Sequence, residues 1–296
     1  MFALCTRAAA AAFAVLSLVS GASAAGEPQP VAVQFRSLDG TVLTGYLFSP
    51  AANPGAKTPA IVMMHGRAGP YSSAAQGRYD ASTLSKRHAA WGSYWAGQGY
   101  AALLVDSFGA RGYPAGFPIH SYDSRPEAVN EVTVRPLDAY GALAYLRSRS
   151  DIDAGRIALQ GWSNGGSATI AALSDETLAA NGLTPTTGFR GGVAFYPACG
   201  LHGRFDGGYR AYAPLRILAG DADEEVSAAH CARLVQDSAG RGSNIGIKVY
   251  PGATHGFDDP NAKRQDVAAN AAATAHAVPA VTTYIRQLFG SNQNGR

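Results

Sequence analysis

Ser163 stands in a sequence context that suits a nucleophile. The segment Gly161-Trp162-Ser163-Asn164-Gly165-Gly166 directly follows an apolar stretch that ends at Gln160, and it leads into a run of small residues that suits a helix. In a Gly-x-Ser-x-Gly pattern between a strand and a helix, the two glycines permit a tight turn that exposes the serine hydroxyl at the edge of the sheet. An ordinary glycine-rich turn is the alternative, but the strand and helix on either side favour a nucleophile.

A serine hydroxyl needs a base in order to attack at neutral pH, and the base needs an acid that orients it. In proteins that carry a nucleophilic serine on such a turn, the acid and then the histidine follow the serine along the chain. His255 lies in a loop just past the last predicted strand, residues 245–250, and we predict that it is the base. The acid is expected in the loop after the strand at 215–219. That loop carries four carboxylates, among which the residue types alone do not choose: Asp221, Asp223, Glu224 and Glu225.

The turn after the apolar strand at residues 59–64 is a further expected part of the site. It reads His65-Gly66-Arg67-Ala68-Gly69. In proteins that carry a nucleophilic serine on a strand-to-helix turn, the turn after a neighbouring strand supplies one backbone N–H to the oxyanion hole. The residue after the nucleophile supplies the other. We therefore assign the backbone N–H groups of Arg67 and Asn164 to an oxyanion hole, and we expect His65 to be structural. The other histidines are interpreted as packed or solvated residues, although the two that lie in loops, His120 and His202, could instead rim the site: His88, His120, His202, His230 and His276.

These residues must be positioned by a sheet with helices on both faces. Residues 31–36 and 41–48, joined through Asp39-Gly40, are predicted to form a hairpin because Asp-Gly is a strong turn signal. From residue 59 onward, apolar strands alternate with helical segments, which predicts an α/β fold with a mostly parallel, doubly wound sheet and an antiparallel N-terminal edge. Further strands are expected at 100–105, 156–160 and 192–196, and helices at 84–97, 137–145, 167–173, 226–235 and 266–289, the last with a break near Pro279.

Residues 1–24 are predicted to be a secretory signal peptide. A cationic Arg7, an apolar run over residues 8–19 and small residues up to Ala24-Ala25 occur in the expected order. A membrane anchor is the alternative, but the apolar run is shorter than the roughly 20 residues that a membrane span needs. Residues 25–296 are predicted to form a single domain, because no linker or internal repeat interrupts them. We therefore expect an exported protein, either periplasmic or secreted.

The composition excludes several kinds of partner. The 296 residues carry 24 Lys and Arg against 21 Asp and Glu, and this near balance argues against nucleic acid or an anionic membrane. No later segment is long and apolar enough for stable membrane insertion. The sequence contains no phosphate-binding loop, dinucleotide fingerprint or zinc-ligand spacing, so we expect no cofactor and no metal. The oligomeric state is left open.

Two cysteines, Cys199 and Cys231, remain once a leader that contains Cys5 is removed. In an oxidising compartment an even pair is expected to be bonded, with two buried thiols as the alternative. The two cysteines are 32 residues apart, and closing such a loop is expected to contribute about 3–4 kcal/mol in the chain-entropy description.

The chain resembles the dienelactone hydrolase family of α/β-hydrolases from about Val31 to Phe289. Five motifs in family order carry the resemblance: residues 65–69, Asp106-Ser107-Phe108-Gly109 with Arg111-Gly112, and residues 161–166, 220–226 and 250–257. The family pattern Gly-x-x-Asp-x-x-Val falls on Gly220, Asp223 and Val226. The resemblance therefore implies that Asp223 orients the histidine, with Asp221 as the alternative. Exported relatives are also similar around Tyr196-Pro197-Ala198-Cys199 and Cys231, which supports the disulfide.

Two departures limit what the resemblance implies. The family's namesake enzymes use a cysteine nucleophile and a glutamate in the oxyanion turn, whereas this chain has Ser163 and Gly66 at those positions. A serine with a full triad is similar to ordinary ester hydrolases. The fold, the triad and the oxyanion positions therefore carry over, but the chlorocatechol-pathway substrate does not.

Together these features predict an exported serine hydrolase that cleaves a small-molecule carboxylic ester or lactone through Ser163, His255 and Asp223 and an acyl-enzyme intermediate. A secreted serine peptidase or acyltransferase could use the same triad, and a binding protein without activity is a further alternative. The loop over residues 107–125 is interpreted as a lid. Four residues are predicted to line the substrate pocket, each with a packing role or a solvated charge as its alternative: Tyr71, Phe108, Arg111 and Trp162.

Overall fold

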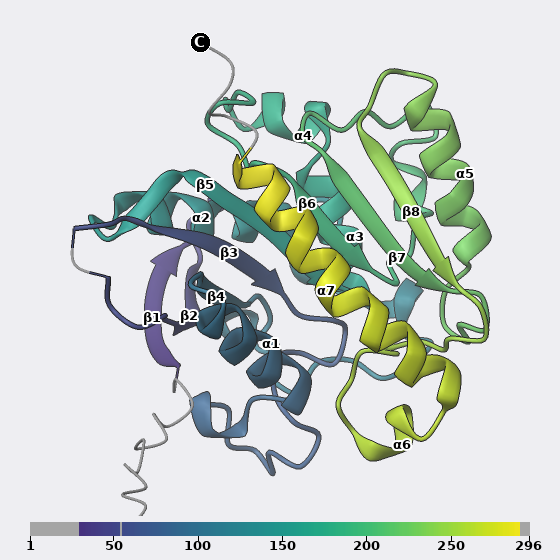
Figure 1. Ribbon diagram of the computed structural model, residues 1–296, viewed down its shortest axis with the longest axis horizontal. Coiled ribbons are helices and arrows are strands. Elements are labelled where there is room, and N and C mark those ends of the chain that lie inside the picture. The colour runs from purple at the N-terminus through teal and green to yellow at the C-terminus, as the bar shows by residue number, and fades with distance from the viewer. Residues whose placement is uncertain (1–29, 54, 291–296) are drawn as a thin grey trace, which may run out of the picture.

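Eight strands form one sheet, and the strands that carry the candidate residues lie in its centre and toward one edge (Figure 1). The structure is a computed structural model that describes residues 30–53 and 55–290, so the predicted leader, residues 1–24, lies outside the described residues. The spatial order of the strands is β1-β2-β4-β3-β5-β6-β7-β8. Their bounds are β1 Val31–Arg36, β2 Val42–Phe48, β3 Thr58–Met64, β4 Ala101–Asp106, β5 Ile152–Trp162, β6 Gly192–Phe195, β7 Leu215–Gly220 and β8 Ile245–Tyr250.

The directions of the strands confirm the predicted fold class. β2 runs antiparallel to both of its neighbours, β1 and β4. Every neighbouring pair from β4 to β8 is parallel. The carboxyl ends of the strands β3, β5, β7 and β8 therefore point in the same direction. The four loops that follow these ends carry the candidate residues.

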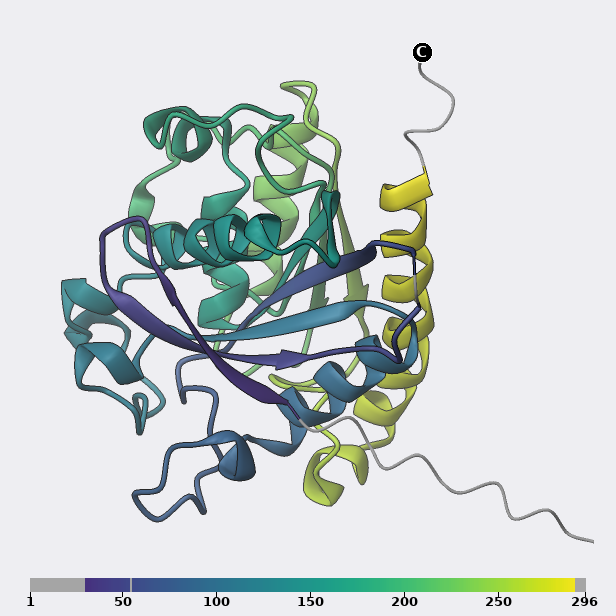
Figure 2. The ribbon, with the colours of Figure 1, turned by 90° about the vertical axis from the view of Figure 1, so that its left-hand side faces the viewer.

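Helices cover both faces of the sheet, as Figures 1 and 2 show. α1 (Lys86–Gly97) and α7 (Ala268–Gly290) cover one face, and α2 (Arg135–Ser148), α3 (Asn164–Ala172) and α5 (Ala228–Ala239) cover the other. The shorter helices are α4 (Asp175–Ala180) and α6 (Ala262–Gln265). Of the helices in residues 30–53 and 55–290, none combines the length and the apolar character that crossing a membrane requires.

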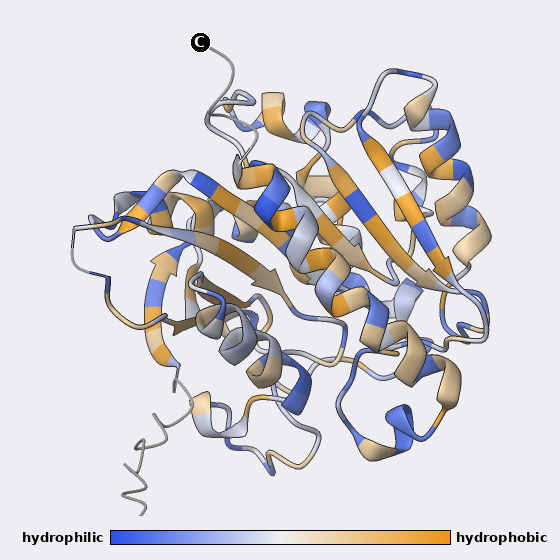
Figure 3. Ribbon diagram, in the orientation of Figure 1, coloured by the Kyte–Doolittle hydropathy of each residue, from blue (hydrophilic) through white to orange (hydrophobic). Residues whose placement is uncertain are grey.

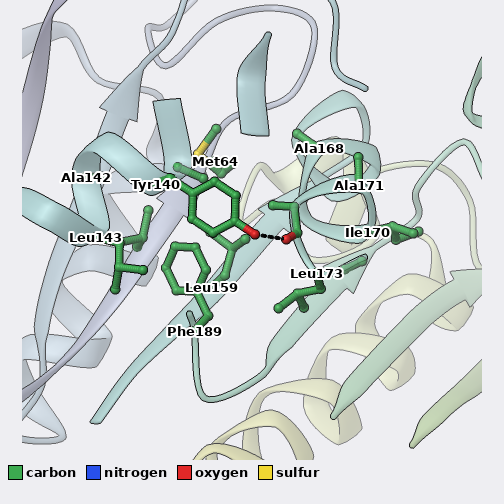
Figure 4. Packing of buried hydrophobic residues seen from close by; sticks show 14 of the residues in the cluster. Met64, Tyr140, Ala142, Leu143, Leu159, Ala168, Ile170, Ala171, Leu173 and Phe189 are labelled. Carbon is green, nitrogen blue, oxygen red and sulfur yellow. Dashed lines mark hydrogen bonds between the residues drawn. The ribbon is translucent and has the colours of Figure 1, made fainter. Parts of the chain in front are cut away.

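The core consists of two apolar layers, one between the sheet and each set of helices. Trp91 and Trp95 of α1 belong to the layer that α7 also covers. In the other layer, shown in Figure 4, Tyr140 of α2 packs against Phe189 and donates a hydrogen bond to the Ala172 carbonyl. All six residues of β4 are buried, and Figure 3 shows that apolar residues dominate the central strands. Strands buried on both faces read as continuous apolar runs, which is why they could be predicted.

The predicted break at Pro279 is wrong, because α7 continues from Ala268 to Gly290 with Pro279 inside it. Proline removes one hydrogen bond from a helix and crowds the preceding turn. The face of α7 that packs on the sheet is buried on both sides of Pro279, and this packing keeps the two halves in one helix. Its buried apolar residues include Ala273, Ala277, Val281 and Ile285.

The segment between β4 and α2, residues 107–134, contains short 3-10 turns at Gly109–Arg111, Tyr122–Ser124 and Glu127–Val129. We call it the β4–α2 segment. Neither these turns nor α4 was predicted, since single turns are too short to show a hydrophobic period.

His88 of α1 is a buried histidine, and its ring packs edge-on against Trp162. Its Nδ1 lies 2.8 Å from Ser85 Oγ and 3.1 Å from the Pro70 carbonyl oxygen. Burial, aided by the positive charge of Arg87, lowers the pKa of His88 to about 4. The ring is therefore neutral in the folded chain at neutral pH.

Mild acid is expected to destabilise the fold through His88. Below pH 6.5 the unfolded chain binds a proton at this residue, whereas the folded chain does so only near pH 4. The stabilisation is complete above pH 6.5 and is lost as the pH falls toward 4, by up to about 3 kcal/mol in the free energy of unfolding. Urea unfolding at pH 7.5 and pH 5 measures this loss. The variant His88→Phe is expected to lose less stability over the same interval, and equal losses in the two proteins would contradict the prediction.

Candidate active site

Ser163 lies on the tight turn between β5 and α3. Its backbone angles are φ 53° and ψ −119°, a conformation that costs free energy for a residue other than glycine. A Cβ atom on Gly161 would lie 2.0 Å from the Gly165 carbonyl oxygen, and one on Gly165 would lie 2.1 Å from that of Met64. Both positions therefore require glycine. The Ser163 N–H donates to the Phe195 carbonyl at 2.8 Å and so ties the turn to β6.

His255 lies in the loop after β8 and contacts both Ser163 and Asp223. Its Nε2 is 2.9 Å from Ser163 Oγ, and its Nδ1 is 2.9 Å from Asp223 Oδ2. The side chains of His255 and Asp223 are only 9% and 1% exposed. A carboxylate beside Nδ1 favours the tautomer with the proton on that nitrogen, which leaves Nε2 free to accept the serine proton. The structure thus brings the three predicted residues together in one hydrogen-bonded chain.

The carboxylates after β7 have different partners. Asp223 accepts backbone N–H bonds at 2.8 and 2.9 Å from the residues two and three positions further on, which fixes its side chain toward His255. Asp221 is exposed and accepts the Gly252 N–H at 2.6 Å. The contact with His255 is therefore made by Asp223 and not by Asp221.

The remaining two carboxylates, Glu224 and Glu225, connect loops of the site through hydrogen bonds. Glu224 accepts the backbone N–H of His255 at 3.0 Å. Glu225 forms a bidentate ion pair with Arg67 at 2.8 and 2.9 Å, which joins the loop after β7 to the turn after β3. Burial by itself would raise the pKa of Glu225, but the hydrogen bonds and charge of Arg67 outweigh it and lower that pKa. Glu225 is therefore ionised at neutral pH.

The two residues assigned to the oxyanion hole line the same cavity as Ser163. Asn164 is the first residue of α3, so its backbone N–H has no acceptor within the helix. The turn with Arg67 lies close to Ser163, since a Cβ atom on Gly66 would be 3.5 Å from Ser163 Cβ. That the backbone N–H groups of Arg67 and Asn164 donate to an oxyanion stays a prediction.

A cavity of about 450 Å³ opens beside Ser163. Its walls come from the turn after β3, the β4–α2 segment, the turn at Ser163, the loops after β6 and β7 and the start of α5. The lining residues are Arg67, Ile119, His120, Tyr122, Arg125, Glu131, Ser163, Asn164, Ala198, Cys199, Gly200, Glu225, Val226, Ser227 and His230. The loop that we interpreted as a lid therefore borders the cavity.

A cluster of polar and aromatic side chains forms one wall of this cavity. The Tyr122 ring stacks on His202 with centroids 4.2 Å apart, and the Arg125 guanidinium lies 5.6 Å from the Tyr122 centroid. Glu131 is buried, and its Oε1 is 3.2 Å from His202 Nε2. Sequence reasoning named only His120 and His202 as residues that could rim the site. It missed the rest of this wall because Tyr122 and Glu131 come from an aperiodic segment, and their partner His202 lies 80 and 71 positions further along the chain.

The four residues predicted to line the pocket need correction, since none of them lines the cavity beside Ser163. Trp162 is fully buried and donates its indole N–H to Asp258 at 2.7 Å. Neighbouring residues at the end of a strand face opposite sides of the sheet, so its side chain lies in the apolar layer under α1 although Ser163 follows it directly. Phe108 is also fully buried, with its ring centroid 4.5 Å from that of His65 and 4.9 Å from the Arg135 guanidinium.

The other two corrected residues, Arg111 and Tyr71, have carboxylate partners. Arg111 pairs with Asp138 at 2.8 Å and with Asp39 at 2.7 Å. Tyr71 donates its hydroxyl to Asp106 at 2.9 Å. Local sequence gave no sign of these partners, so residues near the motifs were assigned to the pocket although they stabilise the structure beside it.

Asp258 is a buried carboxylate three positions after His255, and sequence reasoning missed it. It accepts the indole N–H groups of Trp91 at 2.8 Å and Trp162 at 2.7 Å, together with the Tyr196 hydroxyl, and Arg87 Nε lies 3.4 Å away. It thereby connects α1, the ends of β5 and β6, and the loop that carries the histidine. Asp258 directly follows the Gly256-Phe257 pair, but its partners are between 62 and 171 positions away along the chain, and no local pattern identifies them.

The disulfide predicted between Cys199 and Cys231 is confirmed, with a Cα–Cα distance of 5.0 Å. It joins the loop after β6 to α5, and Cys199 lines the cavity. Within the described part of the chain, no three His, Cys, Asp or Glu side chains are grouped in a way that could hold a metal ion.

Comparisons with known proteins place this site in a family context. The family model of the dienelactone hydrolase family matches residues 43–289. The quorum-quenching protein AidA of Acinetobacter baumannii (strain MDR-ZJ06) is 31% identical over 183 residues, which cover 60% of this chain and 51% of that protein. The chain thus spans about half the length of this curated relative.

Two solved structures have a similar fold. A putative dienelactone hydrolase from Klebsiella pneumoniae subsp. pneumoniae MGH 78578 has a TM-score of 0.62 and 16% identity, with 87% of this chain and 99% of that chain covered. Esterase 2 of Thermogutta terrifontis, phosphorylated by paraoxon, has a TM-score of 0.57 and 18% identity, with 87% and 95% covered.

Proposed function

The chain belongs to the dienelactone hydrolase family, and from this membership and the geometry around Ser163 we propose that it is an exported serine hydrolase of small carboxylic esters or lactones. The reaction is hydrolysis of an ester bond. The observation that carries the proposal is the hydrogen-bonded chain from Ser163 Oγ through His255 to Asp223, which ends at a cavity of about 450 Å³.

In the proposed first step, Ser163 Oγ attacks the substrate carbonyl carbon while its proton moves to His255 Nε2. The carbonyl oxygen takes up the negative charge, and the Asp223 carboxylate stabilises the imidazolium. His255 then gives the proton to the departing alcohol oxygen, which leaves an acyl group on Ser163. In the second step a water oxygen attacks the acyl carbon while His255 removes one of its protons. The bond between the acyl carbon and Ser163 Oγ then breaks, His255 returns the proton to Ser163 Oγ, and the acyl group leaves as the carboxylic acid.

The negative oxygen is held by the backbone N–H groups of Arg67 and Asn164. One such donor contributes about 3–4 kcal/mol to the lowering of the barrier in comparable enzymes. Asn164 also opens α3, so the positive end of the helix dipole adds to this stabilisation. The ion pair between Arg67 and Glu225 supports the proposal, because it fixes the turn that presents the Arg67 N–H.

Export is supported by the bond between Cys199 and Cys231, since disulfides persist in oxidising compartments. The N-terminal sequence pattern is its second support. A serine peptidase or acyltransferase would use the same triad, so the acyl acceptor and the leaving group decide between these reactions.

Hydrolysis of p-nitrophenyl esters from acetate to decanoate, together with an aliphatic lactone, tests the proposed function. Esters or lactones whose acyl chain fits the cavity are expected to be hydrolysed with water as the acceptor. A chain that cleaves peptides or transfers the acyl group to an amine, but leaves every ester and lactone intact, would contradict it.

A further inference from the structure

Arg135 is a fully buried arginine that contacts both sides of the proposed oxyanion hole. One amino group of its guanidinium donates to Asn164 Oδ1, and the other donates to the His65 carbonyl oxygen at 2.8 Å. Asn164 provides one proposed oxyanion donor through its own backbone N–H. His65 begins the turn that presents the other donor, the N–H of Arg67. A single rigid group therefore connects the two segments.

The same two segments are already in close contact at the nucleophile turn. A Cβ atom on Gly165 would lie 2.4 Å from the His65 carbonyl oxygen, the atom that accepts from Arg135. The guanidinium is planar, and its N–H donors stand in a fixed fork. Bonds to both segments consequently set the separation between the turn after β3 and the first residue of α3.

Holding a cation at this position is costly for the fold. No carboxylate among residues 30–53 and 55–290 forms an ion pair with Arg135, and its Nε has no hydrogen-bond partner there. Arg135 is also the first residue of α2, where the helix dipole disfavours a positive charge. Burial lowers the pKa of Arg135 to about 10, although the charges of Asp138 and Glu131 oppose this shift, so the group remains protonated at neutral pH. An apolar residue of similar volume would serve packing alone at least as well.

We infer that Arg135 is a positioning residue for the oxyanion hole, where it holds the Arg67 and Asn164 N–H groups at the spacing that the negatively charged oxygen requires. The inference rests on the proposed function. It assigns Arg135 no contact with the substrate, because the residue does not line the cavity. Its effect is confined to the state in which the oxygen carries charge, and substrate binding is expected to be nearly independent of it.

Arg135→Met tests this inference through kcat and the affinity for a transition-state analogue, which would not change if Arg135 served packing alone. We expect kcat for ester hydrolysis to fall about 100-fold, with KM changed by less than about threefold, because misplaced oxyanion donors act only in the transition state. A trifluoromethyl ketone gives the second readout. Ser163 Oγ bonds to its carbonyl carbon, the serine proton moves to His255, and the ketone oxygen becomes an oxyanion in the hole. Its inhibition constant is expected to rise by the same factor as kcat falls.

Arg147→Met is the matched control, because Arg147 lies on the same helix and also donates to backbone carbonyls, those of Ala154, Thr186 and Gly188, away from the cavity. It is expected to lower the thermal midpoint while kcat and the inhibition constant stay unchanged. Arg135→Lys keeps the charge but loses the fork, so it is expected to behave like Arg135→Met, and it carries the test if the methionine variant does not fold.

The inference is overturned if both Arg135 variants, assayed well below their thermal midpoints, keep wild-type kcat and ketone affinity. Failure of the proposed function looks different. In that case the wild-type chain itself neither hydrolyses esters nor binds the ketone, whatever residue stands at position 135, and the inference falls with it.

Discussion

Replacement of Ser163 by alanine is expected to lower kcat for ester hydrolysis by about 10⁶-fold, which is the scale of loss when the nucleophile of a serine hydrolase is removed. The physical reason is that no other hydroxyl is hydrogen-bonded to His255 Nε2 in the described residues, where Ser163 Oγ lies 2.9 Å from this nitrogen. The fold is expected to persist, because alanine is smaller and the flanking glycines remain. Steady-state hydrolysis of a p-nitrophenyl ester measures the loss.

Ser174→Ala is a suitable control for this variant. Ser174 caps α4 by accepting the Thr177 N–H at 3.0 Å, and it lies outside the cavity. Loss of such a cap is expected to cost about 1 kcal/mol of stability and to leave kcat unchanged. Equal activity of Ser163→Ala and the wild-type chain would remove Ser163 from the mechanism, and the triad with it.

Asp223→Asn is expected to lower kcat by about 10⁴-fold while the chain stays folded. An amide at this position can present an N–H to His255 Nδ1, which favours the tautomer with the proton on Nε2 and prevents that nitrogen from accepting the serine proton. The amide oxygen can still accept the two backbone N–H bonds that hold the side chain. The loss is therefore expected in kcat rather than in stability.

Asp221→Asn provides the matched comparison, since Asp221 stands on the same loop but its carboxylate accepts the Gly252 N–H. Asparagine keeps this hydrogen bond, and activity close to that of the wild type is expected. A large loss in Asp221→Asn together with a small one in Asp223→Asn would exchange the roles of the two acids. Measurement of kcat and KM for both variants distinguishes these outcomes.

The parts of this site that could be predicted are those in which local chemistry restricts residue types. The turn at Ser163 requires glycine at 161 and 165 because neighbouring backbone comes within about 2 Å of where a Cβ would be. Buried strands such as β4 read as apolar runs, and their alternation with helices predicts the parallel sheet. The choice of Asp223 came from the family pattern, since residue types alone left four acids open.

What could not be predicted depends on partners that are distant in the sequence. Trp162 was assigned to the pocket because it adjoins Ser163, yet its partner Asp258 lies 96 positions away. Arg135 begins α2 and gives no local sign that it bonds to Asn164. Pro279 suggested a break in α7, but packing against the sheet outweighs the loss of one hydrogen bond.

Reaction with paraoxon, followed by mass spectrometry, tests the central claim most directly. This phosphate triester is attacked by an activated serine, which displaces p-nitrophenolate and retains the diethylphosphoryl group. We expect one equivalent of p-nitrophenol per wild-type chain, one diethylphosphoryl group on the peptide that contains Ser163, and neither in Ser163→Ala. Ester hydrolysis by a chain that carries no adduct, or an adduct on another residue that also forms in Ser163→Ala, would contradict the assignment of Ser163 as the nucleophile.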